Sequence, residues 1–397
     1  MSARDSSLRI IVTGLAGAFP VGGVAWDYLQ YPIGLAQLGH DVVYHEDSRI
    51  WPYHPIENQP VETASYSAAY IEQFFRTYAP ALAGRWHYRH LGVASFGLSD
   101  PEFRRFARSA DLFLNVSGAS RLPEELGTHC TKAFLDTDPG YNQILLSERP
   151  AWFADANGWM AEFTRHDRYL TYAENIGQRD CLVPQLGIPW ITTRMPIVLS
   201  LWRDIPPPRG AAWSTVMTWN GFRGPLIYRG REYGSKDMEF TKIASLPRKV
   251  STPLKIAAGG GAPMERLMEE GWNVVDAPAA TITPESYRDF IAQSRGEIST
   301  AKNVYVAMRT GWFSSRTACY LASGRPAVVQ DTGFSNYIPP GRGVLAFNTG
   351  DQATRAIGAV ECDYPNHATA AREIATEYFG SGRILARMLD AIFASRM

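Results

Sequence analysis

Residues 299–333 read STAKNVYVAMRTGWFSSRTACYLASGRPAVVQDTG and indicate the fold more clearly than any other stretch of the chain. After Gly311 the apolar residues recur at helical spacing, and Gly324 followed by Pro326 ends the predicted helix. Residues 327–329 are apolar and β-branched enough to form a short buried strand. The predicted order is therefore loop, helix, tight turn, strand and loop.

The start of this helix is a candidate anion site. The first backbone N–H groups of a helix have no partner inside it, so they can bind an anion such as a diphosphate. Ser314 and Ser315 can cap the helix or donate to a phosphate oxygen, and Arg316 offers a planar fork that suits phosphate or carboxylate. An ordinary capped amphipathic helix would carry the same residues, so both interpretations stay open from this stretch alone.

The composition favours two domains. With 397 residues the chain exceeds one ordinary core and suits two domains of about 150–200 residues each. Its 39 basic and 39 acidic residues cancel, which argues against a protein that coats nucleic acid or an anionic membrane with its whole surface. The four cysteines form no C-x-x-C pair, so neither a zinc site nor a disulfide framework is indicated, and we expect a cytoplasmic protein. No apolar run approaches the roughly 20 residues of a membrane span.

The chain opens with a pattern typical of a βαβ unit. Residues 8–12 predict a buried strand, 26–38 a helix and 40–44 a second strand. The glycine-rich residues 13–23 follow the first strand, at the end where ligands of open α/β sheets bind.

This loop also resembles the start of a short-chain dehydrogenase fingerprint. Thr13, Gly14 and Gly17 match it, but Pro20 replaces the third glycine. No tyrosine in the chain has a lysine four positions later, so we disfavour a dehydrogenase.

A proline-dense segment at residues 203–210 reads as a stiff linker. We expect a first domain at 1–202, a second domain at 203–375, and a C-terminal helix at 376–397 that crosses back to the first. The two halves then form doubly wound, Rossmann-like α/β domains that face each other across a cleft.

The quoted stretch resembles the donor-binding segment of GT-B glycosyltransferases, particularly the family-1-type C-terminal domains of spore-maturation-protein-like glycosyltransferases. The match consists of a Gly/Ser loop, the S-x-R run from Ser314, and an A-S-G-R-P turn that leads into an apolar strand at 322–329. The acidic residue that many of these families place before the turn falls at Cys319, and its upstream partner falls at Gly311.

Two further segments carry the resemblance. Arg231 and Lys236 occupy the places of the Arg and Lys in the G-R-x-x-x-K-G segment of GT-B transferases, and Gly22-Gly23 resembles the glycine loop of their first domain. The resemblance assigns to the donor Gly22, Gly23, Arg231, Lys236, Gly260, Gly311, Ser314, Ser315, Arg316, Asp331, Thr332 and Gly333.

The implied activity is transfer of a sugar from a nucleotide-activated donor to a hydroxylated acceptor, without a metal and with no cofactor besides the nucleotide-sugar co-substrate. A small hydroxylated molecule, a glycan and a modified nucleobase stay open as acceptors. The donor nucleotide and sugar, the stereochemical course and the oligomeric state stay open too. A nucleotide-sugar epimerase of the same fold and a non-catalytic nucleotide-sugar-binding protein are the alternatives.

Two carboxylates are candidates for the acceptor side. Asp136 and Asp138 follow a strand-like run at 132–135, and such a D-x-D pair can hold a divalent ion or simply belong to a turn. We favour a carboxylate that faces the cleft, with Asp138 as acceptor base or acceptor ligand. Asp27, at the start of the first helix, is an alternative base or a first-turn acid that complements the helix dipole.

Aromatic and basic residues interleave from Arg85 to His90. This mixture could stack on a planar acceptor, or it could form a solvated helix face whose aromatic residues turn inward.

Overall fold

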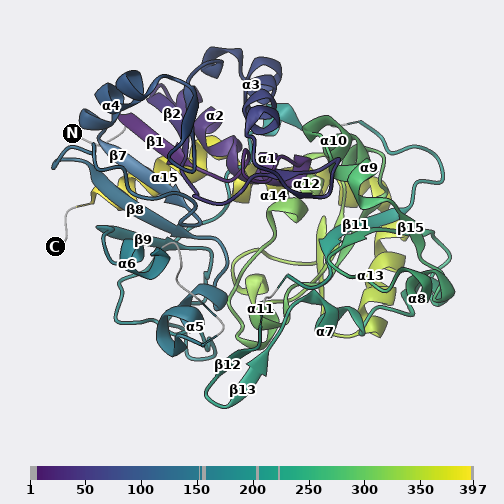
Figure 1. Ribbon diagram of the computed structural model, residues 1–397. Helices are drawn as coiled ribbons and strands as arrows, with labels where there is room; N and C mark the ends of the chain where they lie inside the picture. Colours follow the sequence, from purple (N-terminus) through teal and green to yellow (C-terminus); the bar gives the residue numbers. More distant parts are fainter. Residues whose placement is uncertain (1–6, 152, 154–157, 203–204, 222–223, 395–397) are drawn as a thin grey trace.

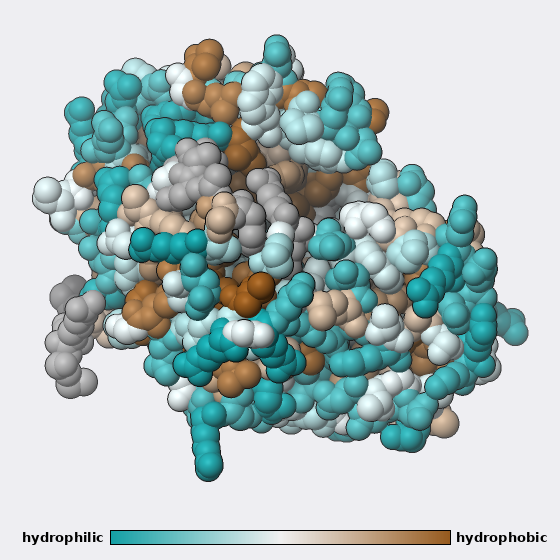
Figure 2. Space-filling view, turned by 60° about the horizontal axis from the view of Figure 1, so that its bottom comes forward, coloured by the Kyte–Doolittle hydropathy of each residue, from teal (hydrophilic) through white to brown (hydrophobic). Residues whose placement is uncertain are grey.

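The computed structural model describes residues 7–151, 153, 158–202, 205–221 and 224–394. Two sheets lie in two lobes, one built from the first half of the chain and the other from the second (Figure 1). The first two residues of the predicted linker, 203 and 204, lie outside the described residues. On the face shown in Figure 2 most side chains are hydrophilic, and apolar side chains gather in a hollow near its centre.

The first sheet has the strand order β10-β9-β8-β7-β1-β2-β5-β6, with every neighbouring pair parallel except β5 and β6. Its strands are β1 (Arg9–Thr13), β2 (Asp41–Glu46), β5 (Trp86–His90), β6 (Ala94–Gly97), β7 (Leu112–Val116), β8 (Thr131–Asp136), β9 (Arg168–Thr171) and β10 (Ile191–Thr192). The helices of this half are α1 (Gly22–Tyr28), α2 (Gln30–Gln37), α3 (Ser65–Tyr78), α4 (Asp100–Arg108), α5 (Tyr141–Glu148) and α6 (Trp159–Phe163). A ribbon of β3 (Tyr53–His54) and β4 (Gln59–Pro60) follows β2.

The side chains of β1 point alternately to the two faces of this sheet, and both faces are covered by helices. Ile10 and Val12 belong to the core that includes α2 and α3, whereas Ile11 packs with Phe103 and Phe106 of α4 on the other face. Successive side chains of a strand point to opposite faces, so a continuous apolar run suits a strand with helices on both sides.

The second sheet has the order β15-β14-β11-β16-β17-β18, and all its neighbouring strands are parallel. Its strands are β11 (Trp213–Thr218), β14 (Leu254–Gly259), β15 (Asn273–Val275), β16 (Gly296–Ser299), β17 (Ala327–Gln330) and β18 (Val344–Phe347). The helices that follow them are α7 (Lys236–Phe240), α8 (Met264–Glu269), α9 (Ala277–Thr281), α10 (Pro284–Ala292), α11 (Asn303–Ala307), α12 (Ser315–Ala322), α13 (Gly350–Cys362), α14 (Tyr364–Phe379) and α15 (Ser381–Phe393). A hairpin of β12 (Leu226–Tyr228) and β13 (Arg231–Tyr233) projects from this half, and 3₁₀ turns cover Pro80–Leu82, Leu199–Leu201, Leu246–Arg248 and Phe334–Asn336 (Figure 1).

The chain ends by returning to the first lobe. The backbone of Ile197 accepts from Ser381 at 2.9 Å and donates to Phe379 at 2.7 Å, which joins the two halves where α14 gives way to α15. Helix α15 then lies against α2, where a Cβ on Gly34 would come within 2.5 Å of Leu385. Glycine is needed there because the two helices approach so closely.

Two predictions about local structure are wrong. The helix predicted at 26–38 is two helices, α1 and α2, and the first begins at Gly22. Pro32 lacks an N–H and fits only within the first turn of a helix, so the chain starts a new helix at Gln30. The stretch from Arg85 to His90 contains strand β5 and not a helix face, because it pairs with β2 and β6.

Among the described residues, no helix is both long and apolar enough to span a bilayer.

Candidate functional site

A cavity of about 610 Å³ lies between the two lobes. Residues that follow β7 and β8 line one side of it, and residues at the ends of β11 and β14 line the other. The carboxyl ends of both parallel sheets therefore meet at this cleft, which is where open α/β sheets bind ligands. Its volume suits a molecule of nucleotide-sugar size.

Lys236 is the first residue of α7, and its side chain lines the cleft. Burial lowers the pKa of this lysine well below its usual range, and the nearby charges of Arg316 and Lys302 lower it further. Within the described part of the chain its ammonium makes no hydrogen bond that would occupy it. The carboxylates of Glu297 and Asp27 offset only part of this effect, so a bound anion would stabilise the ammonium further.

Arg316 lies on α12 and lines the cleft, and residues of strands β11 and β16 fix its guanidinium. Its Nε donates to Oε1 of Glu297 at 2.6 Å, its Nη1 donates to the carbonyl of Val216 at 2.7 Å, and its Nη2 donates to Ser299. Glu297 is fully buried, so this ion pair fixes the plane of the guanidinium. Arg316 thus adds positive charge at the cleft and also neutralises a buried carboxylate.

The first turn of α12 opens onto the same cavity. Ser314 is the N-cap, its backbone is extended, and its side chain makes no capping hydrogen bond. Ser314, Ser315 and Arg316 all line the cavity together with Lys236. The helix start and two cations thus meet at one place, as the sequence predicted for those four residues.

Asp27 approaches this group from α1 of the first lobe. Its Oδ1 accepts a hydrogen bond from the hydroxyl of Ser315, and the carboxylate borders the open cleft. Burial raises the pKa of Asp27 to about 6, against the opposing effects of the Ser315 hydrogen bond and the charges of Arg316 and Lys236. A carboxylate with such a pKa can both hold and release a proton near neutral pH.

Asp138 also borders the cleft, but both of its oxygens are engaged. Lys302 donates to Oδ2 at 2.5 Å and the Tyr305 hydroxyl donates to Oδ1. Asp136 points away from the cleft, where Gln143 and Thr171 each donate to its Oδ2 at 2.7 Å. The two carboxylates thus serve different purposes: Asp136 organises the end of β8, and Asp138 joins the two lobes.

The other predicted donor residues divide into two groups. Gly23 and Gly260 line the cavity, and Gly22 and Arg231 do not. Gly22 instead lets α1 approach α10, since a Cβ there would come within 2.2 Å of the Thr283 carbonyl. Arg231 stands on the exposed hairpin strand β13 with its guanidinium over the ring of Tyr233, and it does not line the cavity.

The predicted loop residues around β17 form a contact between the lobes. A Cβ on Gly311 or Gly333 would collide with Asn175, whose amide donates to the carbonyl of Gly333. Thr332 donates to the Trp312 carbonyl, and Asp331 accepts from the backbone of Gly333 at 2.9 Å. Gly311, Asp331, Thr332 and Gly333 do not line the cavity between the lobes.

No protein-family model matches the chain, and no curated protein sequence matches it. Solved structures do match over nearly the whole chain. An α-glucosyltransferase in complex with UDP and a 13-mer DNA containing an HMU base gives a TM-score of 0.58 at 11% identity, covering 98% of this chain and 100% of that chain. HepE from Anabaena in complex with UDP-glucose gives 0.54 at 10% identity, covering 97% and 100%. Sucrose-phosphate synthase from Thermosynechococcus elongatus gives 0.50 at 13% identity, covering 98% and 95%.

The chain has the GT-B fold. In this GT-B architecture the first lobe runs through strands β1 to β10 and the second through β11 to β18. The expected fold class, two Rossmann-like domains facing across a cleft, is confirmed.

Sequence reasoning missed several cleft residues of this GT-B protein. Lys302 lies in the stretch 299–333, yet it contacts Asp138 across 164 positions of sequence, and such a contact leaves no local signal. Tyr28, Ser117 and Thr137 line the first-lobe wall and were not singled out. Ser117 directly follows β7 and Thr137 directly follows β8, so a place at a strand end was the one signal that could have identified them.

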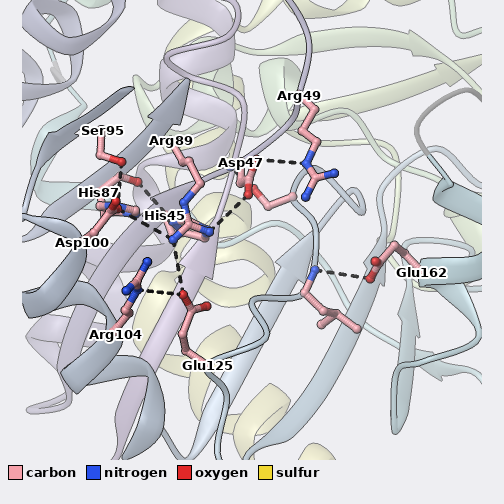
Figure 3. Close-up of polar contacts among 12 residues, drawn as sticks. His45, Asp47, Arg49, His87, Arg89, Ser95, Asp100, Arg104, Glu125 and Glu162 are labelled. Carbon is pink, nitrogen blue, oxygen red and sulfur yellow. Dashed lines mark hydrogen bonds and ion pairs between the residues drawn. The ribbon is translucent and has the colours of Figure 1, made fainter. Parts of the chain in front are cut away.

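A second polar cluster lies on the α4 side of the first sheet (Figure 3). His87 bonds through Nε2 to Asp100 at 3.0 Å and through Nδ1 to His45 at 3.1 Å. Arg89 pairs with Asp47 at 3.5 Å. Burial lowers the pKa of His87 to about 4. Burial, together with the nearby charges of His87 and Arg89, lowers the pKa of His45 well below its usual value. None of these side chains lines the cleft. In the stretch from Arg85 to His90, His87 and Arg89 belong to this polar cluster, whereas Trp86 and Tyr88 pack in the apolar core on the other face of the sheet.

Proposed function

We propose that this protein is a glycosyltransferase that moves a sugar from a nucleotide-activated donor to a hydroxylated acceptor. One observation carries the proposal: Lys236, Arg316 and the first turn of α12 converge in the cleft of a GT-B fold. Such a cluster fits a diphosphate, whose negative charge grows as the sugar leaves. The cations belong to the chain itself, which supports a reaction that needs no metal.

The donor binds on the second lobe in this proposal. Its diphosphate lies against Lys236 and the start of α12, and its base lies against the apolar residues Ala277, Pro278 and Ile282 that line the same wall. UDP-sugars are the first donors to test, because structural neighbours are described with UDP and with UDP-glucose.

The acceptor hydroxyl is activated by Asp27. As the bond between the anomeric carbon and the acceptor oxygen forms, the bond to the diphosphate oxygen breaks. The acceptor proton passes to the Asp27 carboxylate, and the electron pair leaves with the diphosphate beside Lys236. Asp27 suits this role better than Asp138, because Lys302 and Tyr305 occupy both Asp138 oxygens, whereas Asp27 accepts from Ser315 through one oxygen.

The experiment is incubation of the purified protein with a panel of nucleotide sugars, followed by mass spectrometry. Slow release of free sugar and nucleoside diphosphate supports a transferase that lacks its acceptor. An isomerised donor points to an epimerase, and a donor that binds but stays intact points to a non-catalytic binding protein. A parallel thermal-shift screen with nucleoside diphosphates reports binding itself, since a ligand of the folded state raises its stability.

We further propose a cytoplasmic location, supported by four cysteines that are all unpaired. A fusion to a redox-insensitive fluorescent protein, localised in the source cell, tests it.

A further inference from the structure

Charge is divided between the two walls of the cleft. The cations that line it, Lys236, Lys302 and Arg316, all come from the second lobe. The carboxylates that line it, Asp27 and Asp138, both come from the first lobe. Of the lining residues that the structure describes, those of the first lobe include no Lys, Arg or His, and those of the second include no Asp or Glu. An anion is therefore attracted to one wall only.

The first-lobe wall presents a row of neutral hydroxyl groups. The hydroxyl of Tyr28 donates to Ser117 at 3.0 Å, and the hydroxyls of Ser117 and Thr137 lie 2.5 Å apart. Burial raises the pKa of Tyr28 above its usual value, so its hydroxyl stays protonated at neutral pH. Hydroxyl groups both donate and accept, which lets such a row bind the hydroxyls of a ligand.

The β3–β4 ribbon adds an aromatic ring and a proline to the same wall. Tyr53 and Pro55 of the β3–β4 ribbon line the cavity, and the Tyr53 hydroxyl donates to Asn58 at 2.6 Å. Next to them in the chain, Trp51 is 48% exposed and Ile56 is 70% exposed. Trp51 and Ile56 do not themselves line the cavity, so the apolar contribution to this wall comes from Tyr53 and Pro55. The apolar face of a ring can lie on them while its edge reaches the hydroxyl row.

We propose that the first-lobe wall binds an uncharged carbohydrate acceptor: an unphosphorylated sugar ring with neighbouring hydroxyls on one edge. This inference rests on the proposed function and narrows its acceptor. A phosphate or carboxylate on the acceptor would lie beside the Asp27 carboxylate, and the first-lobe lining offers it no cation, while Lys302 is already paired with Asp138. Like charges repel, and the repulsion is stronger in a cleft than in bulk water because the effective dielectric constant is lower. The hydroxyl row instead favours a ligand whose own hydroxyls can form hydrogen bonds with it.

The test compares neutral and anionic acceptors with UDP-glucose and any other donor that the panel shows to be hydrolysed. The neutral probes are methyl and p-nitrophenyl glycosides of common hexoses, and the anionic probes are glucose 6-phosphate, glucuronate and a single-stranded oligonucleotide. We expect transfer to a neutral glycoside with kcat/KM at least about tenfold above that of any anionic probe, a factor that corresponds to about 1.4 kcal/mol.

Variants separate the acceptor from the donor. Ser117→Ala removes the centre of the hydroxyl row, and we expect the acceptor KM to rise by about two- to tenfold while the Kd for UDP is unchanged. Asn58→Lys places a cation at the exposed rim, and we expect the rate with glucose 6-phosphate to rise relative to the rate with the neutral glycoside.

Three results would overturn the inference: preferred transfer to an anionic probe, equal transfer to both kinds, or donor hydrolysis that no neutral glycoside converts into transfer. Each of these leaves the proposed glycosyl chemistry standing, because donor cleavage is still observed. Failure of the proposed function looks different, since no donor is then bound or cleaved at all.

Discussion

Replacing Lys236 tests the diphosphate site most cleanly. A hydrogen bond to a charged group contributes about 1.5–3 kcal/mol, so Lys236→Met should weaken the binding of a nucleoside diphosphate by roughly 10- to 150-fold. Binding of the free nucleoside, which lacks the diphosphate, should not change. Arg316 is a poorer target than its position suggests, because removing it would leave Glu297 as a buried unpaired charge, at a cost of about 3–5 kcal/mol in stability.

The same substitution should affect stability in the opposite direction. A lowered lysine pKa means that the unfolded chain holds the proton more tightly than the folded protein. The buried ammonium of Lys236 therefore lowers the free energy of unfolding at neutral pH, and this loss shrinks as pH rises toward the usual pKa of lysine. We expect Lys236→Met to unfold at an equal or higher temperature than the parent protein in the absence of ligand.

Isothermal titration calorimetry with UDP and with uridine measures the two affinities, and differential scanning calorimetry measures the unfolding temperature. Arg231→Met is the matched control, since Arg231 lies on the exposed hairpin outside the cleft and its loss should change neither affinity. An equal loss for UDP and uridine, or no loss for either, would refute the reasoning and place the donor site elsewhere.

Three further outcomes are expected. Asp27→Asn should lower turnover by about 10²–10⁴-fold and remove the acid limb of the pH–rate profile near its pKa of about 6. A raised carboxyl pKa stabilises the fold only at low pH, and that contribution is lost as pH rises through about 6. At pH 8 the variant should therefore also have a higher free energy of unfolding than the parent protein. Unchanged turnover would exclude Asp27 as the base. Asp138→Asn should reduce the free energy of unfolding by only about 1 kcal/mol, because its ion pair with Lys302 is partly exposed. It should change turnover by less than about tenfold. A loss of turnover by hundreds of fold would restore Asp138 as the base. Lowering the pH from 7.5 to 4.5 should cost roughly 2–3 kcal/mol of stability through His87, because its folded pKa of about 4 lets the unfolded chain take up the proton first. Urea denaturation at several pH values should show that the free energy of unfolding of His87→Asn depends less on pH than that of the parent protein. An equal pH dependence would contradict the assignment.

The sequence by itself determined the fold class and several of the buried elements. Apolar runs at residues 8–12 and 327–329 predicted buried strands that the structure contains as β1 and β17, because parallel strands are apolar on both faces. The segment from Ser314 to Arg316 predicted a helix start facing an anion, and those residues line the cleft. These features depend on neighbouring residues in the chain, so local pattern was enough to find them.

Only the tertiary structure decided which side chains share the cleft. Arg231 and Lys236 are five positions apart, yet a hairpin strand exposes the first while α7 directs the second into the cavity. Asp27 meets Ser315 and Asp138 meets Lys302 across the two lobes, over separations of 288 and 164 positions. Sequence spacing carries no information about such contacts, because docking of one sheet edge against the other creates them. The division of charge between the walls, and hence the acceptor we infer, follows from that docking.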